Sequence, residues 1–261
     1  MRACIDGIAV LGPGLAGWRV AAAVLAGAAP YVAVDMPKPT TDLLPPAERR
    51  RCGEAARLAL ALGTEALAQA GVAVADIATV FTSSSGNGEV VHQICEALAL
   101  PGREVSPTRF HNSVHNAPAG YWSIGTGSHA PSTSLAVHPG SFAAGLLEAA
   151  LQAHAEARPV LLIAYELPHP FPLSEVAPIV APFGIAMVVQ AARSGASLAE
   201  TTLEFGTDTV PTTLSGALEA LRLGNSAAHA LPLLAAIARG ESAALSLPYL
   251  ADTHLGVTVH P

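Results

Sequence analysis

Short hydrophobic runs alternate along the chain with stretches of helical spacing, so strands and helices are predicted in turn. Residues 4–11 form the first apolar run, and residues 159–167 form one apolar enough for a strand buried on both faces of a parallel sheet. Residues 47–70 repeat apolar positions at helical spacing, and Gly71 follows them as a helix stop. Strands that alternate with helices predict an α/β layered sandwich with a largely parallel sheet.

The remaining elements are predicted from the same patterns and from turn residues between them. Strands are expected at 31–35, within 74–86, and at 132–137, 184–192, 243–248 and 255–260. Helices are expected at 88–99, 117–128, 141–157 and 227–238, the last being the one clear helix after about residue 195. Residues 15–26 fit a short helix or a loop, and residues 105–116 fit a loop.

Composition bounds the size of the core and the kind of partner. The chain has 261 residues, of which 51% are hydrophobic but only 5% aromatic, so its core must consist mainly of Ala, Val and Leu. The net charge of −7 argues against nucleic acid as a partner, and Arg49-Arg50-Arg51 is interpreted as a solvated helix face. Only 13% of residues are charged, which favours a surface partly covered by another subunit.

Cysteine usage and the N-terminus indicate the compartment. Cys4, Cys52 and Cys95 are scattered and form no CxxC, which is typical of a reducing environment. No basic segment followed by an apolar run and a cleavage site opens the chain, and Gly, Pro or charge interrupts every apolar stretch. A cytoplasmic protein without a membrane span is expected.

A glycine-rich turn follows the first predicted strand. Gly12-Pro13-Gly14-Leu15-Ala16-Gly17 matches GxGxxG, and Asp35 ends the next predicted strand. In a dinucleotide-binding fold such glycines approach a pyrophosphate and the acid binds a ribose hydroxyl. Pro13 lies inside the turn and the chain becomes Pro-rich after Asp35, so a structural turn is favoured, with a nucleotide-binding oxidoreductase as an alternative.

Two further motifs fit ordinary structural roles better than binding sites. Ser83-Ser84-Ser85-Gly86-Asn87-Gly88 links a strand to a helix, where it could hold an anion, but helix capping by its serines is favoured. His111 and His115 lie four residues apart, yet no second pair of ligands has metal-site spacing. No metal and no cofactor are therefore expected.

The segment 132–157 has the shape of a nucleophile elbow, in which a strand turns sharply into a helix. In enzymes this geometry places a nucleophile at the positive end of the helix. No GxSxG motif is present, and the turn carries His138, Pro139 and Gly140, none of which has a thiol.

Residues 105–150 resemble the N-terminal half of β-ketoacyl synthases of the thiolase-like fold. The residues and segments that carry the resemblance are Val105-Ser106-Pro107, Asn116, Ala119-Gly120, Gly127, Pro131 and the strand 132–137. Segments 8–17, 45–70, 159–167 and 182–192 fit in order, so the resemblance covers about residues 4–192. It implies a thiolase-like layered sandwich, truncated relative to full ketosynthases, with residues 1–192 as the ketosynthase-like half and residues 193–261 as a shortened remnant packed on the same core.

The departures from that family concern its catalytic residues. In the family that the chain resembles, the elbow carries a Cys. Counting from Asn116 and Pro131 places that position at Pro139, or at His138 with a one-residue slip. The family's two catalytic histidines are also missing, because the histidines after residue 195 stand in no comparable motif: His229, His254 and His260. Without a nucleophile a condensing reaction is not expected.

The resemblance implies a role as a chain-length factor, a non-condensing subunit that pairs with an active β-ketoacyl synthase and shapes its acyl tunnel in polyketide or fatty-acid-like biosynthesis. Acyl carrier protein would then be an indirect partner, and aryl polyene clusters give the narrower likeness. The residues implied to face the partner's tunnel are Arg109, Phe110, Asn112, Ser113 and Asn116. A second alternative is an enzyme that uses His138 to decarboxylate malonyl-carrier protein.

Overall fold

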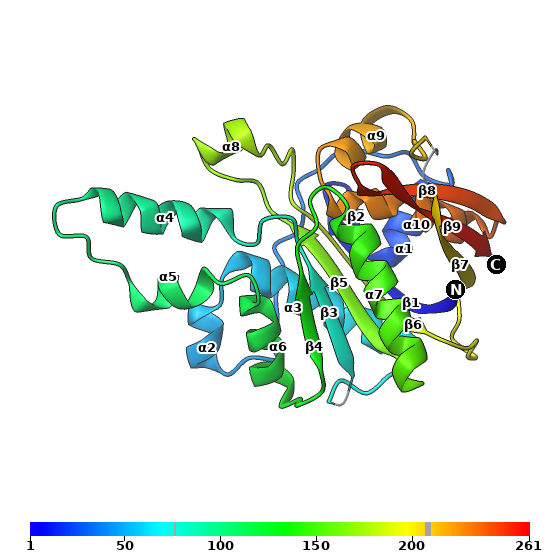
Figure 1. Ribbon diagram of the computed structural model, residues 1–261, viewed down its shortest axis with the longest axis horizontal. Coiled ribbons are helices and arrows are strands. Elements are labelled where there is room, and N and C mark those ends of the chain that lie inside the picture. Colours follow the sequence, from blue (N-terminus) through cyan, green and yellow to red (C-terminus); the bar gives the residue numbers. More distant parts are fainter. Residues whose placement is uncertain (76, 207–209) are drawn as a thin grey trace.

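The structure is a computed structural model that describes residues 1–75, 77–206 and 210–261. Its elements are labelled in Figure 1. The strands are β1 (Arg2–Gly12), β2 (Leu15–Ala16), β3 (Ala78–Thr82), β4 (Ser132–Leu135), β5 (Val160–Glu166), β6 (Phe183–Gln190), β7 (Ala199–Gly206), β8 (Ala243–Leu250) and β9 (Thr253–His260). The helices are α1 (Trp18–Leu25), α2 (Pro46–Arg51), α3 (Glu54–Ala70), α4 (Gly88–Ala99), α5 (Pro107–Asn112), α6 (Ala117–Thr126), α7 (Ser141–Glu156), α8 (Leu173–Val176), α9 (Gly216–Leu223), the 3₁₀ turn η1 (Ala227–Ala230) and α10 (Leu231–Arg239).

In the described part of the chain, nine strands form one sheet. Its order is β4-β3-β5-β6-β1-β7-β9-β8, and β2 pairs with β1 outside that path. Parallel pairing joins β3 to β4 and β5, whereas the other pairs are antiparallel. The parallel pairing expected from the sequence is thus confined to β4-β3-β5, and the sheet as a whole is mixed.

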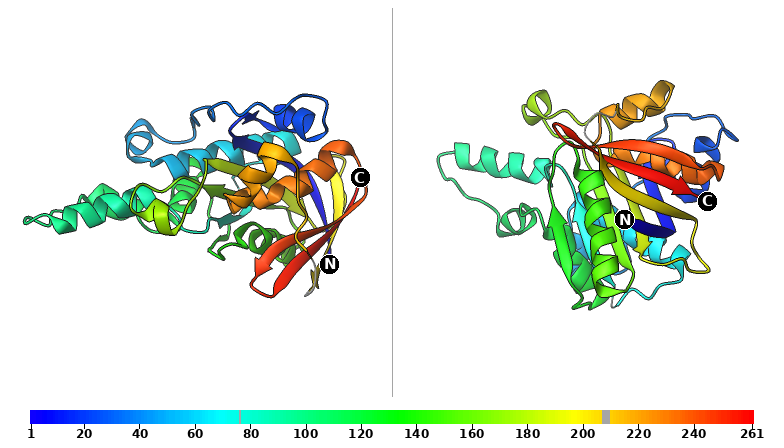
Figure 2. Two further views of the ribbon diagram at one scale, coloured as in Figure 1. Left: turned by 90° about the horizontal axis from the view of Figure 1, so that it is seen from above. Right: turned by 45° about the vertical axis from the view of Figure 1, so that its right-hand side comes forward.

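Helices cover both faces of this sheet, so the expected layered sandwich is present (Figures 1 and 2). α3 packs on β1, β5 and β6 from one side, and α7 packs on β3, β5 and β6 from the other. Along β5 the side chains alternate, with Leu161 and Ile163 in the α3 layer and Leu162 in the α7 layer. A Cβ on Gly63 of α3 would lie 2.7 Å from the Trp122 ring, so small residues permit the close packing expected of this core.

Four local predictions differ from the structure. The expected helix 47–70 is broken at Cys52, whose extended backbone separates α2 from α3. The expected strand 31–35 has no regular structure, because its backbone covers the glycine-rich turn through a bond from Gly14 N to Val34 O. The expected loop 105–116 contains α5, which begins at Pro107. Beyond residue 195, β7 and α9 were not predicted.

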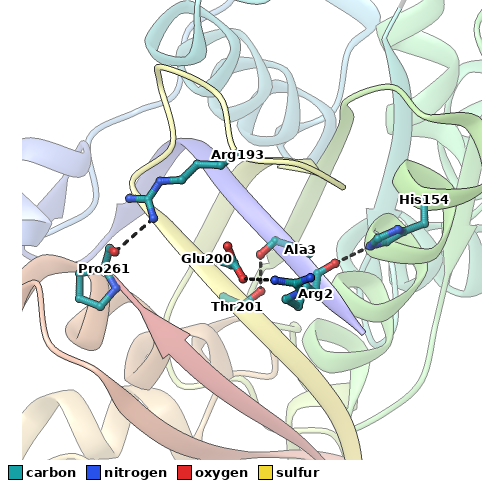
Figure 3. Close-up of polar contacts among 7 residues, drawn as sticks. All are labelled: Arg2, Ala3, His154, Arg193, Glu200, Thr201 and Pro261. Atoms are coloured by element: carbon teal, nitrogen blue, oxygen red, sulfur yellow. Dashed lines mark hydrogen bonds and ion pairs between the residues drawn. The ribbon is translucent and has the colours of Figure 1, made fainter.

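The C-terminal segment joins the same sheet as the first strand. β7 pairs with β1 on one side and with β9 on the other. Figure 3 shows the side-chain contacts at this junction: Arg2 pairs with Glu200 at 3.5 Å, and Thr201 Oγ1 donates to Ala3 O at 2.9 Å. The described residues of this segment, 193–206 and 210–261, therefore contribute strands to the same sheet and side chains to the same core, while a domain boundary near residue 192 stays a prediction.

None of the helices in the described ranges is both long enough and apolar enough to cross a bilayer.

Candidate functional site

The predicted elbow is present between β4 and α7. Gly140 precedes the first turn of α7 and is buried, whereas His138 and Pro139 are exposed. The hydroxyl nearest to the turn, Ser141 Oγ, is buried and accepts a hydrogen bond from Val137 N at 3.1 Å. Because this hydroxyl already bonds its own turn, the elbow presents no free nucleophile in place of the missing thiol.

Strand β8 covers the elbow from outside. A Cβ atom built on Gly140 would lie 1.9 Å from Tyr249 O, so the backbones of the turn and of β8 are in direct contact. Beside it, the rings of Tyr249 and Phe205 lie with centroids 5.5 Å apart. Position 140 therefore accepts no side chain, and the C-terminal hairpin occupies one side of the turn.

A histidine that the sequence did not connect with the elbow lies against it. His229, in η1, is 7% exposed and hydrogen-bonds to the backbone of Pro139, whose only polar backbone group is its carbonyl. Burial, reinforced by the positive charge of Arg222, lowers the pKa of His229 to about 4. The ring is therefore neutral near pH 7 and donates one N–H to the turn.

The charge near His229 is itself neutralised. Arg222 is buried and forms a bidentate pair with Glu219, at 2.7 Å and 2.6 Å. The hydrogen bond from Arg222 lowers the pKa of Glu219 to about 2, so the carboxylate stays ionised. The polar groups next to the elbow are thus bonded to the turn or to each other.

The decarboxylase alternative gains no geometric support. His138 is exposed, and no described residue hydrogen-bonds to its ring. A general base or acid is usually oriented by a second group, as in the nucleophile–base–orienter arrangement. His138 lacks such an orienting partner in the described part of the chain.

The nucleotide-binding alternative is contradicted. Gly12–Gly17 forms an antiparallel hairpin turn in which Leu11 faces Ala16. A Cβ on Gly14 would lie 2.2 Å from Val32 O, and Tyr31 Oη donates to Pro13 O at 3.0 Å. The segment predicted as the second strand therefore fills the space that a pyrophosphate would need.

Helices α4 and α5 project from the body as an arm, and both figures show it extending away from the sheet (Figures 1 and 2). We call residues 88–114 the arm. Its exposed apolar side chains are Val91, Leu98, Leu100, Phe110 and Val114. Solvent contact of so many large apolar groups on one projection is typical of a surface that another chain covers.

The residues predicted to face a partner lie on or just after this arm, and the structure separates them. Arg109, Phe110 and Asn116 are exposed, while Ser113 is half-buried and donates to Phe110 O at 2.8 Å. Asn112 differs from the expectation, because it is only 7% exposed.

Asn112 ties the arm to the body instead of projecting outward. Its Nδ2 donates to Arg51 O at 2.8 Å, and its Oδ1 accepts from Tyr121 Oη at 3.0 Å. The buried amide thus joins α5 to α2 and α6, and it satisfies the buried Tyr121 hydroxyl as well as the Arg51 carbonyl.

The Ser83–Gly88 turn lies where the arm leaves β3. Asn87 caps α4, since its Oδ1 accepts from Val90 N at 3.2 Å; a serine was expected to do this. The two histidines considered as metal ligands have separate contacts: the ring of His111 lies edge-on to Tyr121, and His115 Nε2 bonds Ser83 O at 3.0 Å.

A family model described as "Beta-ketoacyl synthase, N-terminal domain" matches residues 25–247. Comparison with curated protein sequences finds no match.

Three solved structures resemble the chain over nearly its whole length. One is described as a ketosynthase (ApeO) in complex with its chain length factor (ApeC) from Xenorhabdus doucetiae, with a TM-score of 0.76, 24% identity and 99% of both chains covered. The ishigamide ketosynthase/chain length factor gives a TM-score of 0.74 at 17% identity, covering 100% of this chain and 99% of that one. AntDE:AntF, described as a type II PKS acyl-carrier protein in complex with its ketosynthase bound to the hexaketide, gives 0.76 at 12% identity, with 99% of both chains covered. At these identities the likeness establishes the fold, which confirms the thiolase-like, ketosynthase-type fold predicted from the sequence.

Proposed function

The chain belongs to the family of β-ketoacyl synthase N-terminal domains, and from this premise we propose that it is a non-condensing subunit of the chain-length-factor kind. It pairs with an active β-ketoacyl synthase and shapes the tunnel in which the partner's acyl chain grows. The active subunit supplies the nucleophile and receives the acyl group from an acyl carrier protein. A polyene product is the narrower form of this proposal, and a cytoplasmic location stays a prediction.

The projecting arm is the observation that carries the pairing. Its large apolar side chains are solvated in the single chain, and covering them in a complex removes that cost, at roughly 25 cal/mol per Å² of apolar surface. Phe110 near its end is 67% exposed, although a ring of this size is usually buried. An obligate partner explains this surface, because such interfaces resemble a core divided between two chains.

The elbow supports the non-condensing part of the proposal. It offers no thiol, its nearest hydroxyl is already bonded, and β8 lies against Gly140. The structures that resemble this chain add support of another kind, since two are described as ketosynthase/chain length factor assemblies and the third contains an acyl-carrier protein.

A co-purification experiment tests the pairing. The chain is co-expressed with each tagged β-ketoacyl synthase of its source organism, and the expected result is a stoichiometric complex with one of them. Phe110→Ser should weaken that complex at least tenfold, whereas Leu223→Ser should leave it unchanged. Leu223 is the matched control, because it is equally exposed at 67% but lies on α9.

Product analysis tests the tunnel. The pair should convert malonyl- and acyl-carrier protein into chains of defined length, and Phe110→Ala in this subunit should shift that length. A chain that remains monomeric with every synthase, and that leaves each synthase's products unchanged, would overturn the proposal.

A further inference from the structure

A buried carboxylate lies at the root of the arm. Glu166, the last residue of β5, is 1% exposed. It accepts hydrogen bonds from Ser226 Oγ at 2.6 Å, from Ser83 Oγ at 3.2 Å and from the backbone N–H of Ser84. No Lys, Arg or His of the described residues forms an ion pair with it. The carboxylate is thus held entirely by hydrogen-bond donors from the Ser83–Gly88 turn and from the C-terminal segment.

The turn that Glu166 holds is attached to both ends of the arm. Ser83 Oγ accepts from Gly86 N at 2.9 Å, which shapes the turn just before α4 begins. The carbonyl of Ser83 bonds the ring of His115, the residue that follows the arm. The two ends of the arm therefore meet at one turn, although they are 27 positions apart in sequence (115 − 88).

A second contact fixes the first residue of the arm. His169 Nε2 and Ser85 Oγ lie 2.8 Å apart, and the ring of His169 lies against Gly88. A Cβ on Gly88 would be 2.0 Å from His169 Nδ1, so only glycine permits this approach. The start of α4 is thereby held between the turn and the segment that follows β5.

The arm has two anchors: Asn112 ties α5 to the body, and this root holds α4, which has little other support. Among the helices and strands, α4 packs mainly on α5, which belongs to the same arm. A small rotation at the root would displace the tip of a 12-residue helix, about 18 Å long, by several ångströms.

We propose that Glu166 is a positioning residue for partner binding, which fixes the angle of the arm by holding the Ser83–Gly88 turn against β5 and Ser226. This inference rests on the proposed pairing function and adds the element that orients the binding surface. Through Ser226, the C-terminal segment takes part in orienting an arm that it does not belong to.

The chain contains a matched control for Glu166. Asp6 is also a buried carboxylate, and it accepts from Ser194 Oγ at 2.6 Å, from Ser197 Oγ at 2.7 Å and from the side chain of Gln190. It lies near the other end of β6, since Glu166 pairs with Phe183 and Gln190 pairs with Cys4. Glu166→Gln and Asp6→Asn therefore make the same chemical change at similar burial, one at the root of the arm and one far from it.

Hydrogen exchange on the isolated chain gives the first measurement. Glu166→Gln should accelerate exchange of amides in residues 84–116 at least tenfold relative to wild type, while Asp6→Asn should leave this segment unchanged. If Glu166→Gln does not fold, Ser226→Ala and its control Ser197→Ala provide the same comparison with a single hydrogen bond removed and a smaller, two- to fivefold change.

The dissociation constant of the complex gives the second measurement. Glu166→Gln should raise it at least tenfold and Asp6→Asn less than twofold. Equal effects of the two variants on either measurement would overturn the positioning role while leaving the pairing function intact. Failure of the wild-type chain to pair with any synthase would instead refute the proposed function. The positioning role would be refuted together with it, because it presupposes the pairing.

Discussion

Gly140 and Tyr249 are in backbone contact at the elbow: a Cβ on Gly140 would lie 1.9 Å from Tyr249 O. This contact joins the start of α7 to the C-terminal hairpin, two segments more than 100 positions apart (249 − 140). The turn predicted to correspond to the nucleophile turn of ketosynthases is a packing surface for β8.

Gly140→Ala should therefore destabilise the chain by about 2–3 kcal/mol, because the new methyl group forces the turn and β8 apart. Gly120→Ala is the control, since Gly120 lies in α6 with no atom within 4 Å of the added Cβ. Removing a helical glycine there should stabilise by about 0.5–1 kcal/mol. Urea unfolding of both variants measures the difference, and equal stabilities would contradict the contact.

Restoring a thiol should not restore condensation. Pro139→Cys and His138→Cys place a sulfur at an exposed position, so iodoacetamide should label both. Neither should form a β-ketoacyl product from malonyl- and acyl-carrier protein, because the nearby histidine, His229, is buried and its ring bonds the turn itself. Mass spectrometry of the protein and of the products checks both statements. A product above background would show that the elbow keeps a working site.

The low pKa of His229 predicts a stability that falls in mild acid. The unfolded chain has a histidine of ordinary pKa, near 6.5, whereas the folded chain holds it at about 4, so the unfolded state binds the proton more readily. This contribution to stability is complete above pH 6.5 and is lost progressively as the pH falls toward 4. The loss amounts to about 2 kcal/mol by pH 5.

His229→Gln should remove this fall of stability between pH 7.5 and pH 5 and keep a donor for the Pro139 carbonyl. Urea unfolding of wild type and variant at pH 7.5 and pH 5 measures the free energy of unfolding at each pH. Glu219 does not interfere, because its lowered pKa makes a contribution that is lost only below about pH 4.5. The same pH dependence in the variant would assign the effect to other groups.

Substitution of Asn112 should lower the stability of the fold more than substitution of an exposed residue near it. Asn112→Ala leaves the Arg51 carbonyl and the buried Tyr121 hydroxyl without their partner and should cost about 1–3 kcal/mol. Asn116→Ala, at an exposed position, should change stability by less than about 0.5 kcal/mol. Thermal unfolding distinguishes the two, and similar melting temperatures would place Asn112 outside the buried network.

Local patterns predicted the core of the fold well where burial decides the structure. The apolar run at 159–167 became β5, and the Ala-rich segment after the elbow became α7. The strand expected at 31–35 failed because Val32 and Val34 remain exposed and their backbone covers the glycine-rich turn. β7 was missed because it consists largely of Thr and Glu and contains few large apolar residues, so it shows no clear strand pattern.

The candidate site could be predicted only in part, for a physical reason. The missing thiol and the arm residue Phe110 were visible in the sequence, because each concerns one position in a recognisable segment. The contacts of His229 with Pro139 and of Glu166 with Ser226 join segments at least 60 residues apart, and no local pattern records them. Asn112 was misjudged since an amide in a surface helix has the same sequence appearance whether it bonds inward or outward.

The central position of β1 has a consequence for how this chain is made. β1 is synthesised long before the two long strands that flank it: Cys4 faces Gln190 of β6, and Arg2 faces Thr202 of β7. At 5–20 residues per second, ribosomes need roughly 10–40 s to reach those partners. Throughout that interval this apolar strand has β2 as a partner only at its end, so early contact with chaperones, or with a companion chain translated nearby, would decide the yield of soluble protein.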